Sequence, residues 1–113
     1  MSAALNLAAQ RTWSVDCADA ADWIESRLTA FPQDLVTVIF HTIVWQYLAE
    51  ETQERIKASL KAASNQARAR SPLAWVRMEA EGESAGLRLT VWPGGEERLL
   101  GRADFHGRWV RWL

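Results

Sequence analysis

The sequence predicts an α/β domain with an open, mostly parallel sheet, flanking helices and an antiparallel C-terminal meander. Segments with strand and helix periodicity alternate over residues 1–72, which is typical of βα units around a parallel sheet. Residues 36–40 form an unbroken apolar run, as in a strand covered on both faces. Beyond residue 73, short alternating segments are separated by turn residues such as Pro93-Gly94-Gly95, which indicates antiparallel strands.

The elements of the first half follow from periodicity and from breaking residues. Residues 2–10 are typical of a short helix, and apolar and polar residues alternate over 12–17, which predicts a strand. Asp19 can cap a helix over residues 20–30, which ends before Pro32 because proline disfavours helix at the preceding residue.

The apolar strand is expected over residues 35–40, and a helix over residues 43–69, with a kink near Ala49. Ser71-Pro72 ends this helix. The next strand is expected over residues 73–79, where the two-residue period places Trp75, Arg77 and Glu79 on one face. The meander strands are expected over residues 87–92, 97–103 and 108–113.

Length and composition predict one domain of ordinary soluble character. The chain has 113 residues and a net charge of -1; residues 1–72 form the βαβα part and residues 73–113 the last parallel strand with the meander. No apolar run is long enough to span a bilayer, and the N-terminus lacks the basic region of a signal peptide. The lone Cys17 allows no intrachain disulfide, so a cytoplasmic location is expected.

His41 is the first candidate functional residue. It follows the apolar strand directly, and open α/β sheets bind ligands at the carboxyl ends of their strands. The imidazole could serve there as a general base or could position a ligand. The alternative is a structural histidine that caps the next helix or is hydrogen bonded at the sheet edge. His106 is far away in the sequence and no metal-ligand spacing occurs, so no metal site is expected.

Three further side chains are candidates for substrate binding. Trp45 and Tyr47 could form an aromatic wall, although a tryptophan at helical spacing from Leu48 is also typical of plain core. Glu79 lies near the end of its predicted strand. Together with Arg77 it could orient a ligand, or the two could form a structural ion pair.

The C-terminal meander offers a different kind of site. Four of the seven tryptophans lie in residues 73–113, interleaved with arginines. Faces that combine tryptophan and arginine can stack bases and neutralise phosphates. However, residues 68–113 carry eight basic and six acidic side chains, a net charge of only +2. Because nucleic-acid domains usually show a stronger basic bias, this function is disfavoured.

Four segments carry a resemblance to a known family: DCADAADWIESRL, VIFHTIVWQYL, PLAWVRMEAEG and LRLTVWPGGEERLLGRADFHGRWVRWL. They resemble the carboxyl-terminal half of a bacterial family of uncharacterised proteins, domain of unknown function 2332. Members of that family are much longer, and their fold is similar to that of class I S-adenosylmethionine-dependent methyltransferases. The resemblance implies a partial Rossmann-like domain of methyltransferase type.

The resemblance also implies roles for individual residues. The loop after VDC would place Asp16 or Asp19 beside the adenine of S-adenosylmethionine, and the end of VTVIFHT would place His41 beside the transferred methyl group. Trp45 or Tyr47 would then meet the acceptor. The glycine-rich turn that holds the methionine end has no counterpart here, because all six glycines lie at or beyond position 82.

We therefore expect an incomplete methyltransferase-like domain that is non-catalytic alone. S-adenosylmethionine would bind only if a partner completes the pocket, either in a homo-oligomer or with a complementing N-terminal half. Two other functions stay open: a protein-interaction module that uses an exposed sheet edge, and nucleic-acid binding through the tryptophan- and arginine-rich face.

Overall fold

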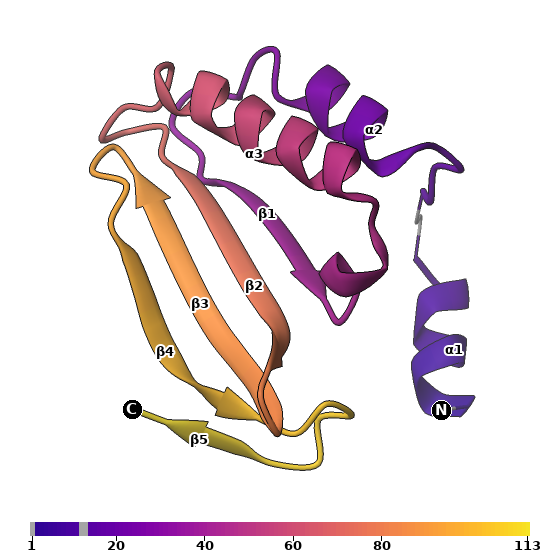
Figure 1. Ribbon diagram of the computed structural model, residues 1–113. Helices are drawn as coiled ribbons and strands as arrows, with labels where there is room; N and C mark the ends of the chain where they lie inside the picture. Colours follow the sequence, from indigo (N-terminus) through magenta and orange to yellow (C-terminus); the bar gives the residue numbers. More distant parts are fainter. Residues whose placement is uncertain (1, 12–13) are drawn as a thin grey trace.

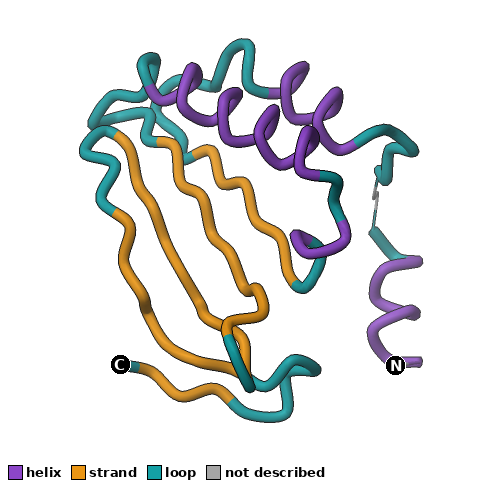
Figure 2. Tube along the Cα trace, viewed as in Figure 1, coloured by secondary structure: helices purple, strands orange, loops and turns teal. Residues whose placement is uncertain are grey.

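The computed structural model describes residues 2–11 and 14–113 and has a helical layer on one side of a curved sheet (Figures 1 and 2). In chain order its elements are α1 (Ser2–Ala9), α2 (Ala20–Arg27), β1 (Thr37–Thr42), the 3-10 helix η1 (Trp45–Tyr47), α3 (Glu50–Ser64), β2 (Leu73–Glu81), β3 (Ser84–Trp92), β4 (Glu97–Ala103) and β5 (Val110–Trp112).

The strands of the described residues form one five-stranded sheet in the order β1-β2-β3-β4-β5. Only β1 and β2 are parallel, and α3 connects them. The three other pairings are antiparallel. The α/β class is thus confirmed, but the prediction of a mostly parallel sheet is wrong. The reason is that residues 14–17 add no strand beside β1, which leaves a single parallel pair in the described sheet. After β2, Gly82, at a φ of 81°, and Glu83 reverse the chain in a two-residue hairpin, and such a hairpin can only join antiparallel neighbours.

The core lies between the sheet and helices α2 and α3. Leu60 of α3 and Leu73 of β2 are its largest fully buried side chains. Ile24 and Leu28, from α2 and its C-terminal end, and Ile56 of α3 complete the contact. Ile24 and Leu28 are four residues apart, as are Ile56 and Leu60, which is the spacing of an amphipathic helix with one face on a sheet. Burial of these apolar side chains stabilises the contact between helices and sheet.

Polar contacts fix the helical layer. The carboxylate of Asp19 accepts the backbone N–H of Asp22 at 3.0 Å, which confirms Asp19 as the N-cap of α2. Arg55 of α3 donates to Asp22 at 2.7 Å and to both carboxylate oxygens of Glu25 at 2.9 and 3.0 Å. These bonds hold α2 against α3 and raise the pKa of Arg55 above its ordinary value.

Two predicted elements differ in the structure. Residues 14–17 are not in a strand, and Thr12 and Trp13 of the same predicted strand lie outside the described residues. The helix predicted from Ile43 is interrupted: η1 comes first, and α3 begins only at Glu50. Two backbone features explain this. Ile43 has a left-handed φ of 46°, which cannot start a right-handed helix, and the extended backbone of Leu48 and Ala49, with ψ of 140° and 149°, separates η1 from α3.

β1 is not covered on both faces, as the apolar run predicted. Ile39 and His41 are partly buried on the side of the helices, whereas Val38 is 48% and Phe40 72% exposed. Two facts explain this: β1 is an edge strand, and α2 and α3 cover only one face of the sheet. A further apolar segment, α1, has no buried residue and stands apart from the sheet in Figure 1.

Candidate functional site

A pocket of about 660 Å³ lies beside β1, at the end where this strand leads into η1. Three consecutive residues of β1, namely Ile39, Phe40 and His41, line it. Because side chains alternate between the two faces of a strand, a pocket that touches three in a row lies beside the strand's edge. The remaining lining residues come from the loop before α2, from α2 itself, from η1 and its flanks, and from α3: Ser14, Val15, Asp16, Ala18, Ala20, Trp23, Ile24, Arg27, Val44, Trp45, Leu48 and Ile56.

His41 is hydrogen bonded at both ring nitrogens. The indole Nε1–H of Trp75 donates to Nε2 at 3.0 Å, so Nδ1 carries the proton that is shared with the carboxylate of Glu79. The side chains of His41 and Glu79 are each only 14% exposed. The imidazole ring also stacks on Trp45, with the ring centroids 5.2 Å apart. This arrangement fixes both the tautomer and the orientation of the imidazole.

The other oxygen of Glu79 binds the backbone at the start of η1. Oε1 accepts the N–H of Val44 at 2.9 Å and the N–H of Trp45 at 3.1 Å. The left-handed backbone at Ile43 turns the chain so that these two successive N–H groups point at one carboxylate. Glu79 thus joins the end of β1, the start of η1 and strand β2 through three hydrogen bonds.

Asp16 lies at the rim of the pocket. Its Oδ2 accepts the indole N–H of Trp23 at 2.7 Å and a guanidinium N–H of Arg27 at 2.8 Å. These bonds, first that of Trp23 and then that of Arg27, hold the pKa of Asp16 below its ordinary value. The carboxylate is therefore ionised at neutral pH, and its Oδ1 takes part in neither of these bonds.

The pocket brings together three of the six predicted site residues: Asp16, His41 and Trp45. Glu79 lies behind the pocket wall as the partner of His41. Asp19 does not line the pocket, since its carboxylate caps α2. Tyr47 is 75% exposed and does not line it either.

The sequence analysis missed Trp75 as a partner of His41, and Trp23 and Arg27 as partners of Asp16. For Trp75, the sequence does contain a partial signal. Trp75 and Glu79 lie on one strand face, and the parallel register places His41 opposite Arg77, between them. Only the register, which periodicity cannot supply, turns that pattern into a contact. The predicted pair of Arg77 with Glu79 does not form; Arg77 pairs with Glu97 instead.

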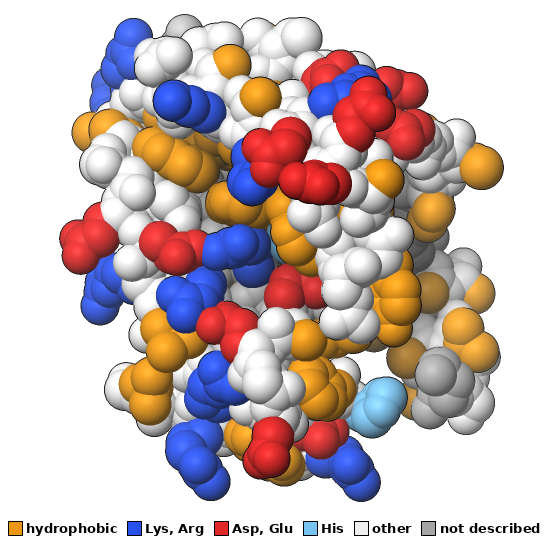
Figure 3. Space-filling model, viewed as in Figure 1, with side chains coloured by type: hydrophobic (Ala, Val, Ile, Leu, Met, Phe, Trp, Pro, Cys, Tyr) orange, Lys and Arg blue, Asp and Glu red, His pale blue; other side chains and the backbone are white. Residues whose placement is uncertain are grey.

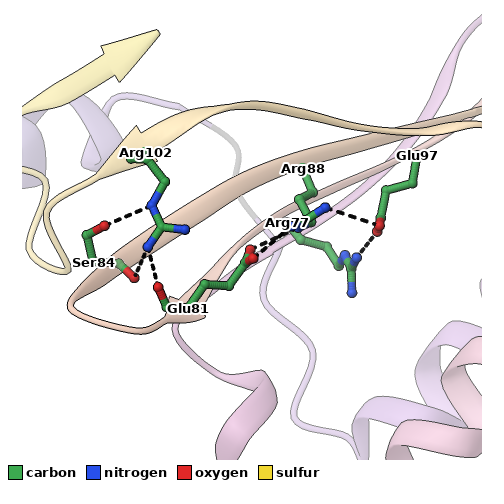
Figure 4. A network of polar contacts seen from close by, with 6 residues as sticks. All are labelled: Arg77, Glu81, Ser84, Arg88, Glu97 and Arg102. Carbon is green, nitrogen blue, oxygen red and sulfur yellow. Dashed lines mark hydrogen bonds and ion pairs between the residues drawn. The ribbon is translucent and has the colours of Figure 1, made fainter. Parts of the chain in front are cut away.

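Two arginines of the meander, Arg88 and Arg102, are held by neighbouring groups of the sheet (Figure 4). Arg88 forms two hydrogen bonds with Glu81, at 2.8 and 2.9 Å, and these lower the pKa of Glu81. Arg102 donates to Ser84 Oγ at 2.9 Å and to the backbone carbonyl of Glu81. Figure 3 shows basic and acidic side chains interspersed across the visible face, with no large area of one sign.

Among residues 2–11 and 14–113, no group of three or more histidine, cysteine, aspartate or glutamate side chains is arranged to hold a metal ion. Within the same residues, no helix has the length and apolar character needed to cross a membrane.

Comparison with protein families gives one match: the model of an uncharacterised protein family conserved in bacteria, DUF2332, matches residues 1–112. The chain belongs to the DUF2332 family. Comparisons with curated proteins and with solved structures gave no match. In this DUF2332 member, the pocket and the edge of β1 are candidate binding features.

Proposed function

We propose that this DUF2332 protein is an incomplete, methyltransferase-like ligand-binding domain whose pocket beside β1 holds the adenosine end of a cofactor of the S-adenosylmethionine type. One observation carries the proposal: a single pocket is lined by Asp16, His41 and Trp45, the residues expected beside adenine, methyl group and acceptor. The volume of about 660 Å³ lies within the usual range of small-molecule sites.

The chemistry of the lining supports a flat heteroaromatic ligand. Trp23 and Trp45 offer aromatic faces, and Ile24, Ile39 and Leu48 offer apolar contact. Asp16 Oδ1 could accept an N–H from the exocyclic amine of adenine or from a similar donor while Oδ2 keeps its two bonds.

His41 has a positioning role in this proposal. Because both ring nitrogens are hydrogen bonded, the imidazole can accept a proton only after the bond to Trp75 opens. The described residues offer no glycine-rich turn between a strand and a helix for the methionine end of the cofactor. We therefore infer that the domain does not catalyse methyl transfer alone, and that a second copy or a complementing chain completes it.

The test is calorimetric titration of the purified chain with S-adenosylhomocysteine, with the oligomeric state measured in the same buffer. Micromolar affinity that is lost in Trp45→Ala and kept in Tyr47→Ala is the expected result. Tyr47 is the matched control, because it is an aromatic residue of the same 3-10 helix but lies outside the pocket. No heat and no thermal shift at millimolar ligand would contradict binding by this chain.

A second candidate function is a protein-interaction module. Two features of β1 favour it: the strand lies at an edge of the described sheet, and Val38 and Phe40 are exposed on the face that the helices do not cover.

A further inference from the structure

Among residues 2–11 and 14–113, no strand pairs with one edge of β1. The N–H of Thr37 bonds to Pro72 O at 3.0 Å, and the N–H of Ile43 bonds to Met78 O at 2.8 Å, both toward β2. Backbone groups of successive residues in a strand point to opposite sides. Those of Val38, Phe40 and Thr42 therefore point away from β2, where no strand of the described chain pairs with β1.

The two edges of the sheet differ in how they are protected. β5 has only three residues, one of them Arg111, and short, charged edge strands resist further pairing. β1 has six residues, TVIFHT, without lysine, arginine, aspartate, glutamate or proline. The pairing of β1 with β2 also runs without a register shift. β1 thus lacks the usual devices that prevent another strand from adding to an edge.

The pocket makes this edge into a slot. It lies beside β1, and its lining includes Ile24 of α2 and Val15 of the preceding loop, so the helical layer borders this edge of the sheet. The two charged side chains of the lining, Asp16 and Arg27, neutralise each other in a 2.8 Å ion pair. A segment that pairs with this edge of β1 would therefore lie next to a mostly apolar lining that carries no net charge.

We propose that β1 pairs with an extended segment of a second polypeptide, and that this segment is uncharged and apolar on both faces. Its backbone would bond to Val38, Phe40 and Thr42. Side chains on one face would border the slot, and those on the other would join the exposed Val38 and Phe40. An uncharged strand complements the neutral slot, since burying an unpaired charge there would be costly. This inference rests on the proposed incompleteness of the domain and names the chemistry of what completes it.

The probe is a lysine-flanked peptide with an apolar centre, KKVIVLVKK, added to the full chain. Its controls are the same peptide N-methylated at alternate residues, in both registers, which keep the side chains but remove the backbone donors of one edge. Amide hydrogen exchange is read by NMR. The expected result is that exchange of the Val38, Phe40 and Thr42 amides slows by about tenfold or more. The Ile39 and His41 amides, which face β2, keep their rates, and at least one N-methylated peptide has no effect.

Two matched variants sharpen the test. Val38→Lys places a charge beside the β1 edge, and Val110→Lys does the same on β5; the two valines are 48% and 50% exposed. Loss of protection in the first variant alone supports the proposal. Unchanged exchange of the three amides at saturating peptide would overturn it. So would protection of these amides without peptide in a concentration-dependent dimer, because the occupant would then be a second copy.

The S-adenosylhomocysteine titration is run on the same sample without peptide. If S-adenosylhomocysteine binds but the peptide does not protect the three amides, the strand proposal alone is contradicted. If the peptide protects the three amides but S-adenosylhomocysteine binds neither in its presence nor in its absence, the cofactor proposal alone is contradicted.

Discussion

The imidazole of His41 and the carboxylate of Glu79, 38 residues apart in the sequence, form the hydrogen bond that joins the end of β1 to β2. The same carboxylate accepts two backbone N–H groups at the start of η1. The candidate pocket therefore has one wall, His41 stacked on Trp45, that depends on a single acidic side chain outside the lining.

Replacing Glu79 should destabilise the fold. Glu79→Ala removes the acceptor for His41, Val44 and Trp45 together, and leaving such groups unsatisfied costs about 1–3 kcal/mol. Urea denaturation should show this loss in the free energy of unfolding. Glu83→Ala, in the exposed turn of the next hairpin, should change it little, and equal effects of the two variants would contradict the role given to Glu79.

His41→Ala tests whether the histidine is structural. Because both ring nitrogens are hydrogen bonded and the side chain is 14% exposed, we expect a loss of about 1–3 kcal/mol in the free energy of unfolding. A melting temperature equal to that of the wild type, together with loss of S-adenosylhomocysteine binding, would instead assign His41 to the ligand.

Ile43 offers a test of backbone strain. A β-branched residue at a φ of 46° is held in a region that costs L residues roughly 1–2 kcal/mol, a cost that glycine avoids. Ile43→Gly and Ile43→Ala both remove the side chain, so their difference isolates the backbone. Chemical denaturation should show the glycine variant to be the more stable, and the reverse order would show that the turn is relaxed.

Two glycines should respond differently to alanine. At Gly101 a Cβ would lie 2.5 Å from the backbone carbonyl of Arg111, so β5 must move away from β4. At Gly86 the obstacle is the end of the flexible Glu81 side chain. Gly101→Ala should therefore cost more, on the order of 1–3 kcal/mol. Thermal unfolding of the two variants measures this, and an equal or larger loss for Gly86→Ala would be contrary to expectation.

The pH dependence of stability should contain a contribution from Asp16. Its pKa is lowered in the folded protein, so the unfolded chain binds a proton first as the pH falls. The stabilisation is complete above the ordinary carboxyl pKa of 3.8 and is lost as the pH drops from there through the lower folded value. Urea midpoints between neutral and acid pH should fall less steeply in this window for Asp16→Asn. Parallel curves would show that the contacts with Trp23 and Arg27 do not persist in solution.

The sequence by itself determined helix α2, the buried face of α3 and the antiparallel meander. Asp19 caps α2 because its short carboxylate reaches a helix N–H, and Ile56, Leu60 and Ala63 are buried because they share one helix face. The two-residue period placed Trp75 and Glu79 on the side of β2 where both now meet His41. These are effects of neighbours in the chain, and periodicity records them.

The tertiary structure alone decided the order of the strands, the exposure of β1 and the partners of His41. An apolar run is the same whether its strand is central or at an edge, so Val38 and Phe40 were expected to be buried and are exposed. Likewise, Ile43 has no sequence signal for a left-handed turn, because bonds to distant residues hold it there: its own N–H to Met78 O, and the N–H groups of the next two residues to Glu79. Strand order and register arise from contacts between distant segments, and these contacts leave no period in the sequence.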